Sequence, residues 1–206
     1  MHSLFHNLVK DVPFTDSLKE NVHLFLTLNQ CPKTAEHCIN VGKEARRVAE
    51  RFGANPDSAE IAGWLHDISA VFPSRERIQV SRALQIEVLP EEETFPMIIH
   101  QKISKVMARD IFGIEDSEIL EAIGCHTTLR ARSKLLDQVV FVADKIAWDQ
   151  DGRPPYLEAL TEQLQRSLKH GAFAYIHYLW ERKETLKVIH PWLKEAYDEL
   201  KAALHG

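Results

Sequence analysis

The sequence predicts an all-α protein, and three observations support this fold class. Apolar residues recur at intervals of three and four along most of the chain, as on the buried face of a helix. Proline, asparagine or aspartate stands where such segments begin, and glycine where several end. Alternating apolar and polar residues bounded by hairpin turns are absent from the sequence. We therefore expect one domain over 1–206, with a core at about 30–150 and C-terminal helices at about 156–205 packing on it.

The first two expected core helices are marked by their end signals. One begins at Pro32 and ends before Gly53. Asn55 and Pro56 then suit the N-cap and first position of the next helix, "DSAEIAGWLHD", because asparagine caps free backbone N–H groups and proline lacks one. The dipeptide "HD" at 66–67 falls at the far end of this second helix.

The middle of the chain is expected to alternate helices with breaks. A short helix is predicted at 73–85. The segment "PEEETFP" at 90–96 is expected to be an acidic break because a proline stands at each end. A further helix is expected from about Pro96 to Phe112, with Gly113 as its C-cap.

The next two helices are strongly apolar. Asp116 suits the N-cap of "SEILEAIGCHT" at 117–127, and "SKLLDQVVFVADKIAW" at 133–148 predicts a helix of about four turns. The segment "DQDGRPPY" at 149–156 predicts a loop because it combines glycine with two prolines. Two helices are expected after it, a long amphipathic one at about 156–185 and a last one that begins near Pro191.

Composition excludes several classes of protein. The chain has 45% hydrophobic and 27% charged residues and no apolar run near the roughly 20 residues that span a bilayer, so we expect no membrane association. The start shows no secretion signal, so the expected compartment is the cytoplasm. A net charge of −5 disfavours long nucleic acids as partners. Cys31, Cys38 and Cys125 form no CxxC pair and are expected to be reduced core thiols. The sequence leaves a homodimer open.

Six polar residues are expected to face a common interior. The pair His66 and Asp67 ends an apolar helical run, and His100 shares a helix face with apolar residues three and seven positions later. Asp144 lies in the most apolar helix, where an unpaired carboxylate is costly. Imidazoles and carboxylates without thiolates suit a hydrolytic site that holds Fe, Mn, Zn or Mg. The candidates are His37, His66, Asp67, His100, His126 and Asp144.

Each candidate alone also has a structural explanation. Asp144 could accept hydrogen bonds from a helix end, and His126 could bond a backbone carbonyl. The joint pattern, drawn from five helices, favours a metal site. The remaining histidines lie in terminal or late segments without such a constellation and are expected to be structural: His2, His6, His23, His170, His177, His190 and His205.

Five motifs in order make this pattern specific. "EHCINVGKEA", "AGWLHDIS", "IIHQKIS", "CHTTLRARS" and "FVADKI" cover about residues 30–150. Together they resemble the HD-domain metal-dependent phosphohydrolases and, within that superfamily, the YqeK-type symmetrical diadenosine tetraphosphate hydrolases. The resemblance implies a compact multi-helix bundle with the metal site in its helical core. It also implies cleavage of a phosphoanhydride by metal-activated water, which would give two ADP from diadenosine tetraphosphate.

The resemblance also implies a role for each matched residue. The first ion's ligands would be His37, His66, Asp67 and Asp144. A second ion would use His100 and His126, with Asp67 as the bridge between the ions. His66 and Asp67 form the implied catalytic pair. Iron is the first choice for the one or two bound ions, with manganese, zinc or magnesium as alternatives.

A small nucleotide is the expected substrate. Trp148 or Trp64 could stack on its base, although tryptophan beside apolar helix positions more often belongs to the core. The segment "HTTLR" matches the family's "HTTGR" except at Leu129, and arginine grips phosphate oxygens through forked hydrogen bonds. The residues expected to bind substrate are Thr127, Thr128, Arg130, Lys145 and Arg153.

Departures from the family pattern leave the substrate open. Thr34 stands where the family usually has an arginine, and Ala70 stands where it has a lysine. The segment "KIAWDQDGRPPY" also replaces the family's "YIEPxRxFPG". Two alternatives therefore stay open. One is a nucleotidase or other small phosphate-ester hydrolase on the same scaffold, and the other is a non-catalytic nucleotide-binding regulatory module.

Overall fold

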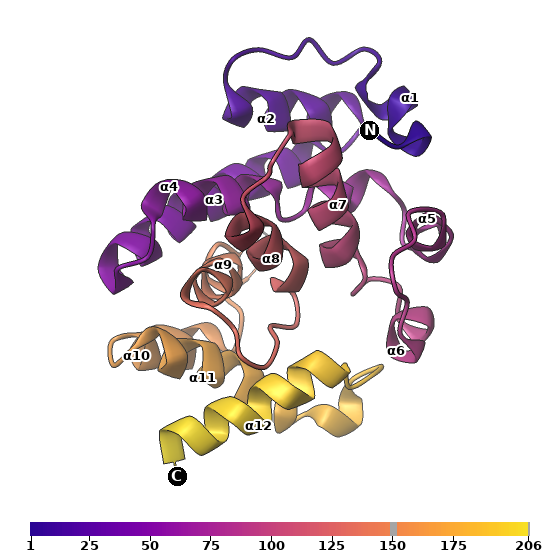
Figure 1. The fold of residues 1–206 in the computed structure, drawn as a ribbon. Coiled ribbons are helices and arrows are strands. Elements are labelled where there is room, and N and C mark those ends of the chain that lie inside the picture. The colour runs from indigo at the N-terminus through magenta and orange to yellow at the C-terminus, as the bar shows by residue number, and fades with distance from the viewer. Residues whose placement is uncertain (149–151, 206) are drawn as a thin grey trace.

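The computed structural model describes residues 1–148 and 152–205. Every regular element in these ranges is helical, which confirms the all-α prediction (Figure 1). None of the described helices is long and apolar enough to cross a membrane. The α-helices are α1 (His6–Val9), α2 (Leu18–Leu28), α3 (Pro32–Phe52), α4 (Pro56–Leu65), α5 (Arg77–Ala83), α6 (Pro90–Thr94), α7 (His100–Phe112), α8 (Ser117–Cys125), α9 (Leu135–Ile146), α10 (Leu157–Leu164), α11 (Leu168–Trp180) and α12 (Pro191–His205). Short 3-10 helices lie at η1 (Ser3–Phe5), η2 (Ile68–Val71) and η3 (Lys183–Thr185).

Helices α3 and α4 form a close antiparallel pair beside the site. Gly53 follows α3 in the left-handed conformation, with a φ of 77°, and the Asn55 side chain caps the first turn of α4, as predicted. A Cβ atom on Gly63 of α4 would come within 2.6 Å of the Gly42 Cα atom of α3. Glycine at Gly63 therefore allows the backbones to approach and sets the spacing of the predicted histidines on the two helices.

The hydrophobic core lies where α3, α4, α7, α8 and α9 pack on one another. Leu65, Ile103, Ile123 and Phe141 are fully buried in it, and each such side chain contributes about 1.5–3 kcal/mol by leaving water. In Figure 1, α2 covers one end of this core and α12 lies at the opposite end. Helix α11 contacts both α9 and α12, so the C-terminal helices pack on the core through α11.

One expected break is a short helix. The prediction of an acidic break at 90–96 is wrong, because Pro90–Thr94 forms α6. Glu92 in this helix is fully buried, and its Oε2 atom accepts a hydrogen bond from the Leu89 backbone N–H at 2.8 Å. The same oxygen accepts a hydrogen bond from Lys102 Nζ at 2.8 Å. These donors stabilise the buried carboxylate and the helical turn together.

The long helix predicted at 156–185 is two helices. Helix α10 ends at Leu164 and α11 begins at Leu168. Ser167 is extended between them, and its Oγ atom accepts a hydrogen bond from the His170 backbone N–H at 3.2 Å. This N-cap starts a new helix although the apolar spacing continues across the break.

Other boundaries differ less from the prediction. The helix expected from Pro96 begins at His100, after a turn at 96–99. Of the loop predicted at 149–156, residues 149–151 lie outside the described residues. All three cysteines are free thiols, and Cys38 and Cys125 are buried as expected.

Candidate metal centre

The six predicted residues meet in the helical core. We call His37, His66, Asp67, His100, His126 and Asp144 the imidazole cluster. His37 lies in α3 and Asp144 in α9, whereas His66 and His126 lie at the C-terminal ends of α4 and α8. His100 is the first residue of α7. The nitrogen and carboxylate oxygen atoms form three overlapping groups, each within 4.8 Å, that could hold a metal ion.

Three of the histidines share one arrangement at a helix end. In each, Nδ1 donates a hydrogen bond to the backbone carbonyl three residues earlier. These bonds run from His66 to Gly63 at 2.7 Å, from His100 to Met97 at 2.5 Å, and from His126 to Ile123 at 2.8 Å. A carbonyl only accepts, so Nδ1 carries the hydrogen. In the neutral ring, Nε2 therefore presents a lone pair, which is the form that binds a metal ion.

These Nε2 atoms point at one another and at the two carboxylates. His100 Nε2 lies 2.9 Å from His126 Nε2, and His37 Nε2 lies 3.2 Å from His66 Nε2. Asp67 Oδ1 lies 2.9 Å from His100 Nε2, and Asp144 Oδ1 lies 3.2 Å from His37 Nε2. Acceptors at these distances repel unless a proton or a metal ion lies among them. The arrangement therefore fits a metal ion, and the donor atoms, nitrogen and oxygen without sulfur, suit Fe, Mn, Zn or Mg.

Asp67 lies between the two halves of the cluster. Its Oδ1 atom faces His100 at 2.9 Å and His126 at 3.5 Å, whereas its Oδ2 atom lies 3.7 Å from His66 Nε2. One carboxylate that presents a different oxygen to each group of histidines can ligate two ions at once. This placement suits the bridging role implied by the sequence.

The pKa values of residues in the cluster are set by two opposing influences, burial and the charges of neighbouring residues. Burial disfavours the charge on Asp67, but the adjacent His66 and His100 outweigh it and hold the pKa of Asp67 well below its usual range. Burial likewise opposes the charge on His66, yet Asp67 and Asp144 raise its pKa well above 6.5. Burial prevails at His126 and lowers its pKa to about 4. His126 is thus neutral at pH 7, ready to serve as a ligand.

Lys145 and Thr127 add hydrogen-bond donors at the cluster's edge. Lys145 Nζ lies 2.5 Å from Asp144 Oδ2 and also donates to the His126 carbonyl at 3.3 Å. Burial lowers the pKa of Lys145, but Asp144 outweighs it, so the ammonium stays charged. The Thr127 hydroxyl lies 3.2 Å from His100 Nε2 and 3.1 Å from His126 Nε2.

The cluster opens into a cavity of about 430 Å³. Besides cluster residues, Thr34, Trp148, Tyr156 and Tyr175 line its wall. Trp148 keeps 37% of its surface exposed although it is a large apolar residue. Trp64, the other tryptophan considered from the sequence, packs at the α3–α4 crossing, with its ring where a Gly42 Cβ would stand. The structure therefore places Trp148 beside the cluster and leaves Trp64 in the scaffold.

Three predicted substrate residues are not brought to this cavity. Arg130 forms ion pairs with Glu121 and Asp137, the latter at 2.9 Å, and lines a separate cavity. Thr128 is buried, and its hydroxyl donates to the Leu129 carbonyl at 2.9 Å. Arg153 is exposed and is absent from the described lining of the cluster cavity. The ion pairs of Arg130 explain its position, since two carboxylates hold its guanidinium away from the cluster.

Leu129 explains the family difference in this segment. It has a φ of 56°, in the left-handed region that favours glycine, the residue expected here from the resemblance to the "HTTGR" motif. The leucine side chain is fully buried. Apolar burial offsets the cost of the backbone conformation, which is roughly 1–2 kcal/mol.

Several positioning residues were missed by the sequence analysis. The Ser69 hydroxyl donates to the His100 carbonyl at 2.8 Å, and Ser104 donates to Ser69 Oγ at 2.9 Å. Gln101 Oε1 accepts a hydrogen bond from the Thr127 backbone N–H at 3.0 Å. These bonds fix the start of α7 against η2 and against the end of α8. In the sequence, these residues are marked only by their closeness to the predicted metal ligands. Gln101, for example, directly follows His100.

Comparisons with known proteins agree with this geometry. A family model described as "HD domain" matches residues 34–149, which include all six cluster residues. A solved structure from Clostridium acetobutylicum, described as a "predicted HD superfamily hydrolase involved in NAD metabolism", superimposes with a TM-score of 0.81 at 22% identity. That superposition covers 89% of this chain and 97% of the other, so the two share a fold.

Two relatives extend the comparison to sequence. The chain is 45% identical over 146 residues to a Lactococcus lactis subsp. cremoris protein described as "Uncharacterized protein in pepC 5'region", covering 71% of this chain and 74% of that one. It is 34% identical over 112 residues to the symmetrical bis(5'-nucleosyl)-tetraphosphatase of Bacillus subtilis (strain 168). This second match covers 53% of this chain and only 59% of that enzyme's length.

Proposed function

Since the chain belongs to the HD domain family, we propose that it is a metal-dependent phosphohydrolase that acts on a nucleotide. One observation carries the proposal: the Nε2 atoms of His66, His100 and His126 converge with the carboxylates of Asp67 and Asp144, and each Nδ1 is held by a carbonyl so that Nε2 is the atom free to ligate an ion. His100, His126 and the two carboxylates line an open cavity, which supports a site that meets substrate rather than a sealed structural ion.

The ligands divide into two groups. His37, His66, Asp67 and Asp144 would hold a first ion, and Asp67, His100 and His126 a second. Ions bound there would polarise a phosphoryl oxygen and lower the pKa of a water molecule. Iron is our first choice because the resemblance to the HD-domain phosphohydrolases implies it, and manganese, zinc and magnesium are also compatible with imidazole and carboxylate ligands.

Other residues of the chain would handle the substrate. The charged Lys145 ammonium on the cavity wall can donate to a phosphate oxygen, and the Thr127 hydroxyl lies beside the histidines where it can do the same. The exposed Trp148 ring offers a flat surface for a nucleobase. Diadenosine tetraphosphate, cut into two ADP, is the best single substrate, supported by the likeness to the Bacillus tetraphosphatase.

A second candidate is a nucleotidase or other small phosphate-ester hydrolase. Arg130 is held by two carboxylates, and Thr34 on the cavity wall stands where the family usually has an arginine. Among the lining residues that the structure describes, Lys145 is the lysine or arginine that faces the cluster. A single ammonium suits a short phosphate chain better than the four phosphates of a dinucleoside tetraphosphate.

The proposal is tested by supplying the purified chain, loaded with iron or manganese, with dinucleoside polyphosphates and mononucleotides and separating the products by chromatography. We expect two ADP from diadenosine tetraphosphate and no turnover by the Asp67→Asn variant. Phosphate release from mononucleotides alone would select the second candidate. Binding of nucleotide without any turnover by the metal-loaded protein would overturn the enzymatic assignment and favour a regulatory module.

A further inference from the structure

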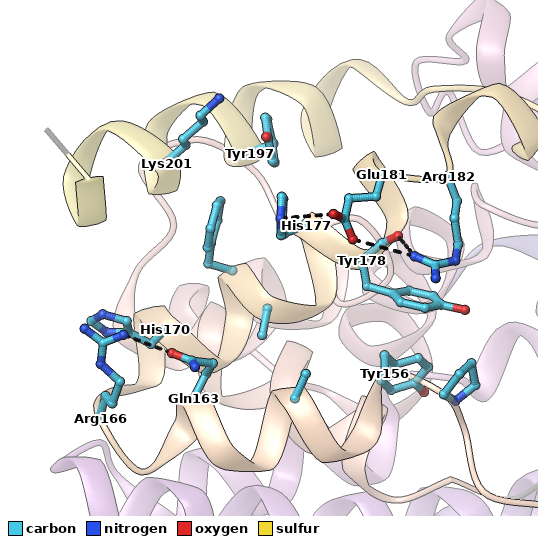
Figure 2. Close-up of a pocket in the computed structure, with 14 residues that line it drawn as sticks. Tyr156, Gln163, Arg166, His170, His177, Tyr178, Glu181, Arg182, Tyr197 and Lys201 are labelled. Atoms are coloured by element: carbon cyan, nitrogen blue, oxygen red, sulfur yellow. Dashed lines mark hydrogen bonds and ion pairs between the residues drawn. The ribbon is translucent and has the colours of Figure 1, made fainter.

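A second cavity lies among the C-terminal helices, outside the HD match. It has a volume of about 640 Å³, and its lining comes from α10, α11 and α12 (Figure 2). The matched family segment ends at residue 149, and every described lining residue of this cavity follows it. Tyr156 lines both this cavity and the cluster cavity, and its hydroxyl donates to the Lys145 carbonyl at 3.3 Å. The two cavities are therefore neighbours with one shared wall residue.

Aromatic rings form the inner walls of this cavity. Phe173 and His177 stack with centroids 5.4 Å apart and planes inclined by 12°, and Phe173 stacks on Tyr197 at 5.7 Å and 24°. Figure 2 shows Tyr178 and Tyr156 together in another part of the lining. Phe173, His177 and Tyr178 are half-buried, whereas Tyr156 and Tyr197 are buried. Half-buried rings at a cavity wall suit a planar aromatic ligand, because offset stacking adds about 0.5–1.5 kcal/mol per ring pair beyond area burial.

Positive charge dominates the rim. Arg166, Arg182 and Lys201 line the cavity and are exposed, whereas Glu181 is the carboxylate among the described lining residues. Glu181 is already engaged, with its Oε1 atom 3.7 Å from His177 Nε2 and its Oε2 atom 3.8 Å from Arg182 Nη1. Three cations around one engaged carboxylate stand out in a chain whose net charge is −5. This rim favours an anionic ligand.

The volume of the cavity indicates what size of ligand it can hold. Small-molecule sites typically have volumes of about 300–1,000 Å³, and they combine apolar walls with a few polar groups. We propose that this cavity is a second ligand site that binds a nucleoside phosphate, with the base against the aromatic walls and the phosphates at the cations of the rim, among them Arg166 and Lys201. The site is separate from the imidazole cluster and does not depend on its metal or on hydrolysis.

The two parts of the ligand contribute together. Exposed cations alone hold phosphate weakly, because water and salt screen pairs at a surface. The aromatic walls alone contact only the base and supply no positive charge to bind phosphates. A ligand that joins a base to phosphates should therefore bind more tightly than either part.

Calorimetry on the full chain treated with EDTA tests this site without metal in the cluster. ADP is titrated beside adenosine and tripolyphosphate, which supply the base and the phosphates separately. We expect one ADP per chain, bound at least about tenfold more tightly than either fragment. Because EDTA removes metal from the cluster, the result does not depend on the proposed hydrolysis. Tripolyphosphate that binds as tightly as ADP would overturn the proposal.

Charge reversal locates the binding. The double variant Arg166→Glu/Lys201→Glu changes two exposed side chains and should weaken ADP binding at least about tenfold. Lys169→Glu is the matched control, because Lys169 is exposed on α11 but does not line the cavity. An ADP affinity that the double variant leaves unchanged, or that the control lowers equally, would place the nucleotide elsewhere and overturn the proposal.

Discussion

Two buried groups of charged residues lie on either side of α7, and their hydrogen bonds differ. The first is the imidazole cluster. The second, which we call the Glu92 cluster, comprises Glu92, Lys102 and His190. Glu92 accepts from Lys102 Nζ at 2.8 Å and from the Leu89 N–H at 2.8 Å, and His190 Nε2 lies 3.4 Å from its other oxygen. Lys102 Nζ also donates to the Glu87 carbonyl at 3.0 Å.

The contrast separates a structural cluster from a ligand site. In the Glu92 cluster, each acceptor of the carboxylate meets a donor, so the group needs nothing further. In the imidazole cluster, Nε2 atoms face each other at 2.9 and 3.2 Å beside two carboxylates, on the wall of a cavity. Burial alone therefore does not identify a site. A ligand site is identified instead by more hydrogen-bond acceptors than donors on the wall of a cavity.

The largest effect should come from Asp67, which contacts both halves of the imidazole cluster. We expect Asp67→Ala to abolish metal retention and to lower hydrolysis at least about a thousandfold, because a ligand shared by two ions is lost. Metal content and turnover are measured on the same preparation, with circular dichroism to confirm folding. Normal turnover by a folded variant with bound metal would contradict the assigned site.

The opposite pattern is expected from Lys102 in the Glu92 cluster. Lys102→Met leaves Glu92 buried without its main counter-ion and should lower the free energy of unfolding by about 3–5 kcal/mol. Metal content and turnover per folded molecule should stay unchanged. Denaturant unfolding measures the loss, and the double variant Glu92→Gln/Lys102→Met should recover part of it. Loss of metal from the folded single variant would mean that the two clusters are not independent.

A smaller, selective effect is expected from His126. His126→Gln removes a ligand from one half of the cluster and should reduce the stoichiometry from two ions to one. His190→Gln is the matched control, since it changes a buried histidine of the Glu92 cluster and should keep both ions. Elemental analysis counts the ions. An unchanged stoichiometry in His126→Gln would show that the second ion lies elsewhere.

The smallest expected effect is on the pH dependence of the free energy of unfolding, to which the two clusters contribute differently. The pKa of His126 is about 4 in the folded chain against 6.5 unfolded, so the unfolded state binds more protons between these values. In metal-free protein, this residue's contribution to stability is full above pH 6.5 and is lost as the pH falls towards 4. Burial opposes the charge on Glu92, but His190 and Lys102 lower its pKa below 4.5, so its contribution is lost only at lower pH.

Urea unfolding of metal-free protein between pH 7 and 4.5 measures this difference. Wild type should lose more stability over that range than His126→Gln. Parallel pH profiles for wild type and His126→Gln would contradict the neutral state assigned to His126.

The sequence predicted features that depend on neighbours along the chain. The Asn55 cap and the C-cap Gly53 are local signals, and both hold in the structure. The convergence of the six cluster residues was also predictable, because helix periodicity turned each toward the core and the motif order supplied the pairing.

Features that depend on distant partners were not predictable. Helix α6 forms where a break was expected, because Lys102 and His190 reach Glu92 from other elements. Arg130 turns away from the cluster because Glu121 and Asp137 bind it, and neither carboxylate is adjacent in sequence. Such pairs are decided by how helices pack, which a local pattern does not record.

Elemental analysis of the purified, untreated chain shows directly whether the imidazole cluster holds metal. We expect one or two ions of a transition metal per chain, iron first, and less than one-tenth of an ion in Asp67→Ala. A folded wild-type chain that carries no metal, and takes up none when iron, manganese or zinc is supplied, would contradict this expectation.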